Sequence, residues 1–314
     1  MRILVVKTHA FGDSLLATPA VSGLVAQGNR VTVLSGPSSL PVWERLPGIE
    51  RIIRSPAPCG GADLFFWSLR NRQKGFDRVI HLGSSSAASR WLRFLTGQKA
   101  ISGGDPGLSL GLVKPAALDY CRIAAVECSC LKPLFPVTEA EFGTALQYTG
   151  SEPYVVLAPG GARNARDFVP LKRWPMSRWV EVSLKLQAMG KRVFLTGGKE
   201  DQKEISSVSG VNLAGKLTWG ETAALISRAT MFAGNDSGPA HLAVAVDTPA
   251  LVLFGPTDPD SLYEKGSIVP ICGTVSCSPC YSNSVFPGCT GKGDCMISIE
   301  SERVIHTLEE MLER

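Results

Sequence analysis

The sequence predicts an α/β protein with two doubly wound domains, each a parallel sheet with helices on both faces. Two observations carry this prediction. At 314 residues the chain is longer than a typical single domain. Short apolar runs also alternate with helical patterns in both halves. A proline-bracketed stretch at residues 133–153 is expected as a linker, so we predict domains at 1–150 and 151–299. The amphipathic residues 300–314 are expected to form a helix that crosses back to the N-terminal domain.

Each expected strand is a run of four to eight mostly apolar residues with Gly, Pro or Asp nearby. The runs in the first half are at residues 2–7, 31–35, 50–54 and 77–82. Helical patterns lie between them at residues 13–27, near Leu40 and at 64–73. The runs in the second half are at residues 154–160, 191–198, 211–215, 230–235, 250–255 and 269–273. Helical patterns accompany them at 176–189, near Asp201, at 221–228 and after Asp236. Because ligands bind at the carboxyl ends of parallel strands, we expect the active site in a cleft between two facing domains.

Composition indicates a water-soluble protein. Hydrophobic residues make up 44% of the chain and charged residues 19%. No apolar run approaches the roughly 18 residues of a membrane span. The beginning, MRILVVKTHAFGD, lacks the apolar core of a secretory signal, so a cytoplasmic location is expected.

Positive charge is concentrated in the first half. Residues 1–150 hold 16 Lys and Arg against 10 Asp and Glu, whereas residues 151–314 hold 16 against 18. This excess indicates an acidic partner, such as a phosphorylated lipid or an anionic membrane leaflet; the alternative is a solvated basic surface. Nucleic acid is not expected, because no binding motif for it is present. Near the aromatic residues Phe65, Phe66 and Trp67, the cations expected to face this partner are Arg70, Arg72, Lys74, Arg90 and Arg93.

The stretch GNDSGPAHLA, residues 234–243, concentrates polar groups at one expected strand-to-helix turn. Asp236 or Ser237 can cap the helix, and Gly238 leaves room for a ligand to approach backbone amides. His241 lies four residues after Ser237, on the same helical face. Because a helix start carries unpaired N–H groups and partial positive charge, it suits a phosphate. The alternative is a well-capped helix with a buried histidine.

Three further turns hold candidate site residues. Asp13, in KTHAFGDSLL, is either a helix N-cap or a general base. Residues 161–175 suit a diphosphate, although a solvated basic loop is the alternative. Glu200, in LTGGKEDQKEI, can accept hydrogen bonds from a ribose diol or simply begin a helix; this segment is not a P-loop. The cations of the 161–175 loop are Arg163, Arg166, Lys172 and Arg173.

The chain has nine cysteines, four of which follow a C-x2-C-x8-C-x5-C pattern. These are Cys277, Cys280, Cys289 and Cys295. They are candidates for a structural zinc site, with reduced loop thiols as the alternative. Disulfides are disfavoured in the expected cytoplasmic location. The other five cysteines are expected to be small buried hydrophobic residues. They are Cys59, Cys121, Cys128, Cys130 and Cys272.

The ordered set of motifs resembles one family. KTHAFGD is followed by KRW, GGKE, DSGPAH, GPTDP and a trailing CSPC region, each at an expected turn or strand end. In this order they resemble glycosyltransferase family nine, the ADP-heptose:lipopolysaccharide heptosyltransferases. The resemblance covers nearly the whole chain, although GADLFFWSLRNRQ and HLGSSSAASRWLRF in the first half cannot be matched to it residue by residue. It implies the GT-B architecture of two Rossmann-like domains facing a cleft, with an N-terminal acceptor-binding domain and a C-terminal nucleotide-sugar-binding domain. The five cations of the first half named above then become candidate acceptor-side cations, facing an anionic lipid-linked glycan acceptor at the inner face of the cytoplasmic membrane.

The resemblance also implies roles. Asp13 matches the catalytic base, Lys172 the lysine on the donor phosphates, and Glu200 the donor-ribose acid. Asp236, Ser237, Gly238 and His241 match the donor-sugar and diphosphate loop. The implied reaction is an inverting transfer of heptose from ADP-heptose, with no metal or other cofactor required. The alternatives are a GT-B nucleotide-sugar epimerase and a non-catalytic nucleotide-sugar-binding protein. Hydride chemistry is not expected, because HAFGD replaces the dinucleotide fingerprint after the first strand.

Overall fold

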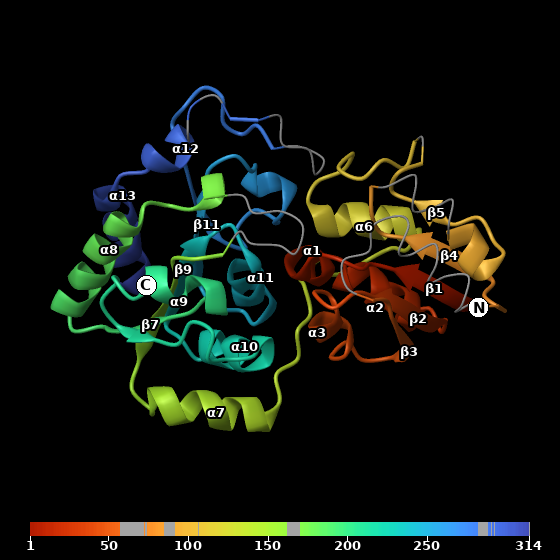
Figure 1. The fold of residues 1–314 in the computed structure, drawn as a ribbon, viewed down its shortest axis with the longest axis horizontal. Coiled ribbons are helices and arrows are strands. Elements are labelled where there is room, and N and C mark those ends of the chain that lie inside the picture. The colour runs from red at the N-terminus through yellow and green to blue at the C-terminus, as the bar shows by residue number, and fades with distance from the viewer. Residues whose placement is uncertain are drawn as a thin grey trace. The chain divides into compact units, whose positions relative to one another are not determined.

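The computed structural model describes residues 1–56, 72, 74–84, 92–105, 107–161, 170–281, 288–289, 291 and 293–313. The chain divides into two compact units. Unit 1 comprises Met1–Leu134 with Asp260–Glu264, and unit 2 comprises Phe135–Pro259 with Lys265–Arg314. Each unit contains one sheet (Figure 1). The division falls after Leu134, whereas the sequence placed it at residue 150.

The sheet of unit 1 is parallel and has the order β3-β2-β1-β4-β5 among the described residues. The order reverses between β1 and β4, as in a doubly wound fold. β1 is the apolar run RILVV, and all of it except Arg2 is buried, as expected for a central strand covered on both faces. The strands are β1 (Arg2–Val6), β2 (Arg30–Ser35), β3 (Ile49–Arg54), β4 (Arg78–His81) and β5 (Ile101–Ser102).

The helix expected at residues 13–27 is in fact two helices. Pro19 has no N–H to donate to the carbonyl of Leu15, so the helical ladder is interrupted there. The hydroxyl of Thr18 donates to that carbonyl instead, at 2.7 Å. The helix expected at 64–73 lies outside the described residues apart from Arg72. The helices of unit 1 are α1 (Phe11–Leu16), α2 (Thr18–Ala26), α3 (Leu40–Trp43) and α6 (Ala116–Ala124).

The sheet of unit 2 is also parallel, with the order β11-β10-β9-β6-β7-β8 among the described residues. The order reverses between β6 and β9. β6, β9 and β10 are buried along their whole lengths, which explains their continuous apolar runs. The strands are β6 (Tyr154–Ala158), β7 (Arg192–Leu195), β8 (Val211–Asn212), β9 (Met231–Asn235), β10 (Ala250–Phe254) and β11 (Val269–Cys272). The predicted α/β class is confirmed.

The middle of the expected linker is a helix. α7 (Glu139–Thr149) packs against α10 (Trp219–Ser227), as Figure 1 shows. It begins with a capping box in which Glu141 N–H donates to Thr138 Oγ1 and Thr138 N–H donates to Glu141. The prolines on both sides of this segment favoured a linker over a helix in the sequence analysis. The other helices of unit 2 are α8 (Met176–Ala188), α9 (Gln202–Ile205), α11 (Gly238–Ala245), α12 (Asp294–Ile297) and α13 (Ser301–Leu312).

The C-terminal helix α13 packs against α8 within unit 2 (Figure 1). Val304 and Leu308 of α13 are buried in the same core as Trp174 and Trp179. The two indole rings meet edge to face, with centroids 5.0 Å apart.

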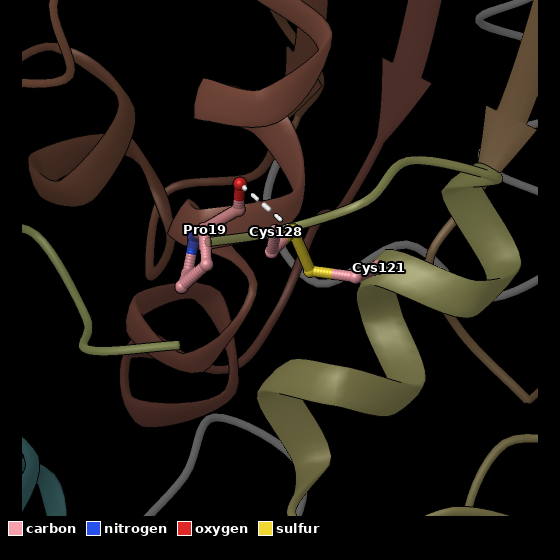
Figure 2. Close-up of a disulfide and its surroundings, with 3 residues drawn as sticks. All are labelled: Pro19, Cys121 and Cys128. Carbon is pink, nitrogen blue, oxygen red and sulfur yellow. Dashed lines mark hydrogen bonds between the residues drawn. A yellow bond between two sulfur atoms is a disulfide. The ribbon is translucent and has the colours of Figure 1, made fainter. Parts of the chain in front are cut away.

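Cys121 and Cys128 were expected to be small buried hydrophobic residues. This prediction was wrong, because the two residues form a disulfide (Figure 2). Helix α6 ends at Ala124, and the left-handed conformation of Ala125, with φ of 52°, turns the chain back. The two Cα atoms come within 6.4 Å, inside the range that a disulfide spans. Cys128 Sγ also lies 3.6 Å from the carbonyl oxygen of Pro19 in α2, so the bridge lies against α2.

Candidate functional site

In unit 2, candidate residues gather where the strand order reverses. β6 and β9 are neighbours, and the sheet continues in opposite directions from them. Ligands of doubly wound sheets bind at the carboxyl ends of strands at such a switch point. Residues 159–161 follow β6 there, and Asp236 and Ser237 follow β9.

Close packing joins these two turns. Gly161 has a φ of +93°, and a Cβ atom on it would lie 2.6 Å from the Cβ atom of Ser237. Only glycine allows the two backbones to approach this closely. The side-chain amide of Asn235 donates to Pro159 O at 2.7 Å and to Gly160 O at 3.2 Å. The backbone between the two strand ends is therefore held in one arrangement.

Lys172 and Asp236 form an ion pair in this region. Lys172 Nζ lies 2.6 Å from Asp236 Oδ2, with 16% of the Lys172 side chain and 3% of the Asp236 side chain exposed. Burial alone would raise the pKa of Asp236, but the charges of Lys172 and His241 outweigh burial, so the pKa lies below its ordinary value. Asp236 is thus a carboxylate near neutral pH, and it places an ammonium group beside the β9 turn.

The start of α11 faces this ion pair. Ser237 is the N-cap residue, but its side chain makes no capping hydrogen bond and donates to Asn235 O at 3.2 Å instead. Gly238 is the first helical residue, and His241 is buried one turn later. The expected carboxylate or hydroxyl cap is therefore not formed. The partial positive charge of the helix start is left for another anion.

Glu200 lies on the 3₁₀ turn Lys199–Asp201, at the carboxyl end of β7. β7 is the other neighbour of β6, so Glu200 belongs to the same edge of the sheet as Asp236. It is exposed, whereas the next residue, Asp201, is buried. A Cβ atom on Gly198 would lie 2.8 Å from Glu200 Oε2. An exposed carboxylate here is available to polar groups of a ligand.

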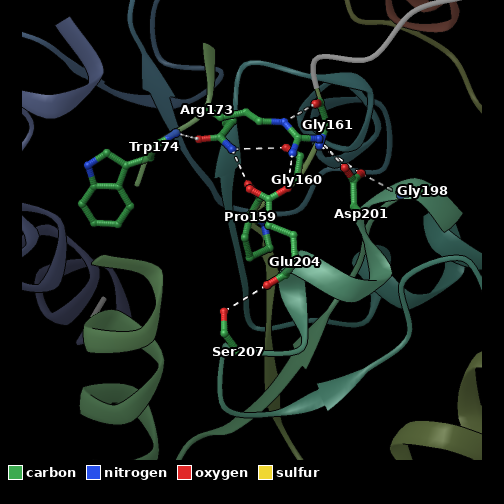
Figure 3. Close-up of polar contacts among 10 residues, drawn as sticks. Pro159, Gly160, Gly161, Arg173, Trp174, Gly198, Asp201, Glu204 and Ser207 are labelled. Atoms are coloured by element: carbon green, nitrogen blue, oxygen red, sulfur yellow. Dashed lines mark hydrogen bonds and ion pairs between the residues drawn. The ribbon is translucent and has the colours of Figure 1, made fainter. Parts of the chain in front are cut away.

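Arg173, expected in the anion-binding loop, has a structural task instead (Figure 3). Its Nε donates to Gly161 O at 2.8 Å, and its Nη atoms bind the carboxylates of Asp201 and Glu204. Asp201 in turn accepts from Gly161 N–H and Gly198 N–H, each at 3.1 Å. The guanidinium thus ties the turns after β6 and β7 together. Arg163 and Arg166 lie outside the described residues.

In unit 1, Asp13 and Lys7 meet at the end of β1, beside the reversal between β1 and β4. Asp13 is the third residue of α1, whose N-cap is Ala10, so Asp13 is not the N-cap. Its carboxylate is half exposed and lies 3.9 Å from Lys7 Nζ. Lys7 is buried and donates to Tyr120 Oη at 3.1 Å. Burial lowers the pKa of Lys7, and the charge of Asp13 opposes part of that fall.

His81, the last residue of β4, completes this edge of the unit 1 sheet. Its Nδ1 lies 2.9 Å from Ser102 Oγ. Burial, followed by the charges of Lys7 and His9, lowers its pKa from the ordinary 6.5 to about 3. His81 is therefore a neutral imidazole at neutral pH, and it adds no positive charge to this edge of the sheet.

Three of the candidate acceptor-side cations are described, and all three are exposed: Arg72, Lys74 and Arg93. Arg70 and Arg90 lie outside the described residues, as do the three aromatic residues near them. No helix in the described part of the chain is long and apolar enough to cross a membrane.

The four C-terminal candidate cysteines line one small cavity in unit 2, of about 20 Å³. Cys295 is buried in α12, Cys280 is half-buried, and Cys277 and Cys289 are exposed. Over the ranges that the structure describes, no three His, Cys, Asp or Glu side chains are already arranged to hold a metal ion.

Sequence reasoning missed three residues that contact candidate residues, one in unit 1 and two in unit 2. Lys7 lies within the KTHAFGD motif, and its pairing with Asp13 was not anticipated. Thr257 lies in GPTDP and is buried, and the contact of its side chain with the Asp236 carboxylate helps to lower the pKa of Asp236. The ring of Tyr281 lies 5.0 Å from Lys172 Nζ. Motif order drew attention to the first two segments, but no signal in the sequence indicated Tyr281.

Three known proteins show similarity along most of the chain. Lipooligosaccharide heptosyltransferase 2 of Haemophilus influenzae is 25% identical in an alignment that covers 86% of this chain and 88% of that protein. Lipopolysaccharide heptosyltransferase 2 of Salmonella typhimurium is 25% identical in an alignment that covers 99% of each. The solved structure of Escherichia coli ADP-heptose lipopolysaccharide heptosyltransferase II aligns with a TM-score of 0.72 at 22% identity, covering 100% of this chain and 99% of that one.

The structural match shows that the two doubly wound units have the GT-B fold, which confirms the predicted architecture. The sequence model of glycosyltransferase family 9 (heptosyltransferase) matches residues 121–286, more than half of the chain. This range includes the ion pair of Lys172 with Asp236 and the helix start after it. The chain belongs to glycosyltransferase family 9, the heptosyltransferase family, and it is a glycosyltransferase enzyme.

Proposed function

We propose that this enzyme transfers a heptose from ADP-heptose to a saccharide of the lipopolysaccharide core, with inversion at the anomeric carbon. The observation that carries the proposal is the Lys172–Asp236 ion pair beside the uncapped start of α11. The names of the family-9 relatives support heptose as the sugar and the lipopolysaccharide core as the acceptor. The epimerase and the non-catalytic binding protein are not favoured by the family assignment.

Unit 2 is the proposed donor-binding unit. Asp236 orients Lys172, whose ammonium group contacts the donor diphosphate as a point charge. Gly238 and the first turn of α11 add backbone N–H groups and the helix dipole, while Ser237 and His241 contact the sugar and the diphosphate. Glu200, exposed at the end of β7, accepts hydrogen bonds from the ribose hydroxyls. These groups come from three strand ends of one sheet.

Asp13 is the proposed general base of unit 1. Its carboxylate removes the proton from the acceptor hydroxyl while the hydroxyl oxygen attacks the anomeric carbon. The bond between that carbon and the diphosphate oxygen breaks on the opposite face, which inverts the configuration. Lys7, 3.9 Å from Asp13, helps to hold the carboxylate in place.

The leaving diphosphate gathers negative charge as this bond breaks. Lys172 and the start of α11 provide fixed positive charge where it develops, so we propose that the transfer needs no added metal ion. The exposed Arg72, Lys74 and Arg93 of unit 1 attract an anionic lipid-linked acceptor at the inner face of the cytoplasmic membrane.

Donor binding and product stereochemistry test the proposal together. Calorimetry with ADP-, UDP- and GDP-sugars should give the strongest binding for ADP-heptose. Proton NMR of the product should show the anomeric configuration opposite to that of the donor. Preference for another base would overturn the donor assignment. Retention of configuration would overturn Asp13 as a base acting in a single displacement.

A further inference from the structure

Four cysteines meet around one cavity in unit 2: two from the CSPC segment, one from residue 289 and one from helix α12. Cys277, Cys280, Cys289 and Cys295 all line the cavity of about 20 Å³, which is roughly the space of one water-sized sphere. Their C-x2-C-x8-C-x5-C spacing is made of two short pairs, and sets of four cysteines typically hold zinc or iron in tetrahedral geometry. We propose that these four thiolates form a closed structural site for one thiophilic metal ion, zinc or iron.

The fold brings Cys277 and Cys280 to the end of β10. Cys280 N–H and Tyr281 N–H both donate to Pro256 O, at 2.9 and 2.8 Å. Ser278 Oγ donates to Gly255 O at 2.6 Å. The CSPC segment is therefore fixed by hydrogen bonds to the main-chain carbonyl groups of Gly255 and Pro256 before any ion binds.

Cys295 reaches the same place from α12. A Cβ atom on Gly255 would lie 3.0 Å from Cys295 Sγ, and one on Gly273 would lie 1.9 Å from Cys295 O. Two glycines are thus needed for β10 and the segment after β11 to pack this closely on Cys295. Ser298 Oγ also accepts from Thr274 N–H at 3.0 Å and donates to Cys295 O at 3.0 Å.

The thiols influence one another electrostatically. All four thiols line one cavity, so as thiolates their negative charges would gather in one place. Thiolates gathered in this way need a cation to offset their charge. Because a thiolate site is seldom fully formed without its ion, binding is expected to draw the four side chains inward and to release protons.

A bound metal ion would stabilise the segments around Lys172, which is part of the proposed donor site. Leu171 lines the same cavity and immediately precedes Lys172. Tyr281 immediately follows Cys280, and its ring lies 5.0 Å from Lys172 Nζ. Pro256, which anchors the CSPC segment, precedes Thr257. An ion held by the four thiolates therefore limits the movement of Lys172, a consequence that rests on the proposed donor function.

Metal analysis tests the site independently of that function. We expect the full-length protein, purified under reducing conditions, to contain about one zinc or iron per chain by plasma mass spectrometry. The double variant Cys277→Ser/Cys280→Ser should lose it. Cys130→Ser, an exposed cysteine of unit 1, is the matched control and should keep the metal. In the wild type, titration with a mercurial reagent should release the ion in step with thiol modification.

Cys289→Ser provides a second variant, because its exposed side chain can be replaced without disturbing the core. It should remain folded by circular dichroism, lose most of the metal and bind ADP several-fold more weakly. The site is overturned if the wild type neither contains nor takes up zinc or iron, or if mass spectrometry finds these cysteines in disulfides. It is also overturned if the double variant keeps its metal. Loss of metal with unchanged ADP affinity would support the metal site and contradict only its proposed effect on Lys172.

Discussion

The ammonium of Lys172 and the carboxylate of Asp236 lie 2.6 Å apart, although 64 residues separate them in the chain. The pair joins the segment before α8 to the turn after β9, with little exposure on either side. Its charges are therefore poorly screened by water. Removing one partner leaves the other charge buried, whereas removing both does not.

This pair predicts a non-additive mutant cycle. Lys172→Met and Asp236→Leu should each lower the free energy of unfolding by about 3 kcal/mol or more, and the double variant should recover part of that loss. Both single variants should also bind ADP at least tenfold more weakly, about 1.4 kcal/mol. Urea denaturation and calorimetry provide the two measurements. Additive stability losses would show that the two groups do not interact.

Replacing Asp13 should separate chemistry from binding. Asp13→Asn keeps the size of the side chain but cannot accept the acceptor proton at a useful rate. Turnover should fall about a hundredfold or more, while donor affinity stays nearly unchanged. Steady-state kinetics at saturating donor, with ADP calorimetry beside it, would measure this. Survival of normal turnover would assign Asp13 a structural role only.

His81 should make the protein sensitive to acid. Its pKa is about 3 in the folded protein and 6.5 when ordinary solvation is restored by unfolding. As the pH falls from 7 to 5, the unfolded chain gains a proton at this position and the folded one does not. The folded state should therefore lose about 2 kcal/mol from this group over that range.

Thermal and urea unfolding of the wild type and His81→Asn at pH 7 and pH 5 would measure this effect. The variant should lose less stability on acidification, because asparagine does not titrate. Equal losses in the two proteins would contradict the neutral, buried imidazole.

Transfer should not depend on added magnesium or manganese. Lys172 and the start of α11 already offer positive charge to the leaving diphosphate, so brief EDTA treatment should leave turnover nearly unchanged. A tightly held thiolate-bound ion is not expected to leave on that timescale. Restoration of lost activity by magnesium alone would instead indicate a metal-bridged diphosphate.

Binding to membranes should depend on charge. A cation near an anionic lipid surface contributes about 1 kcal/mol, so replacing Arg72, Lys74 and Arg93 by serine should weaken vesicle binding markedly. Co-sedimentation with anionic and neutral vesicles at low and high salt would test this, with ADP affinity as the control. Equal binding to both lipids would identify these residues as an ordinary solvated surface.

The elements that the sequence predicted well are strands whose apolar residues are consecutive because the strands are buried. The apolar runs of β1, β6, β9 and β10 are continuous because these strands are covered on both faces. The helix α7 was missed although Thr138 and Glu141 form a capping box. The signal was local and readable, but prolines on both sides made a linker the more obvious interpretation.

The sequence by itself determined the fold class, the order of the turns and the family, because these depend on local patterns and on motifs in series. Only the tertiary structure decided which side chains meet. It paired Lys172 with Asp236 and Lys7 with Asp13, bonded Cys121 to Cys128, and turned Arg173 toward Asp201 and Glu204. These contacts follow from how strand ends and loops pack. Side-chain chemistry along one sequence does not specify which of several nearby charges a cation will reach.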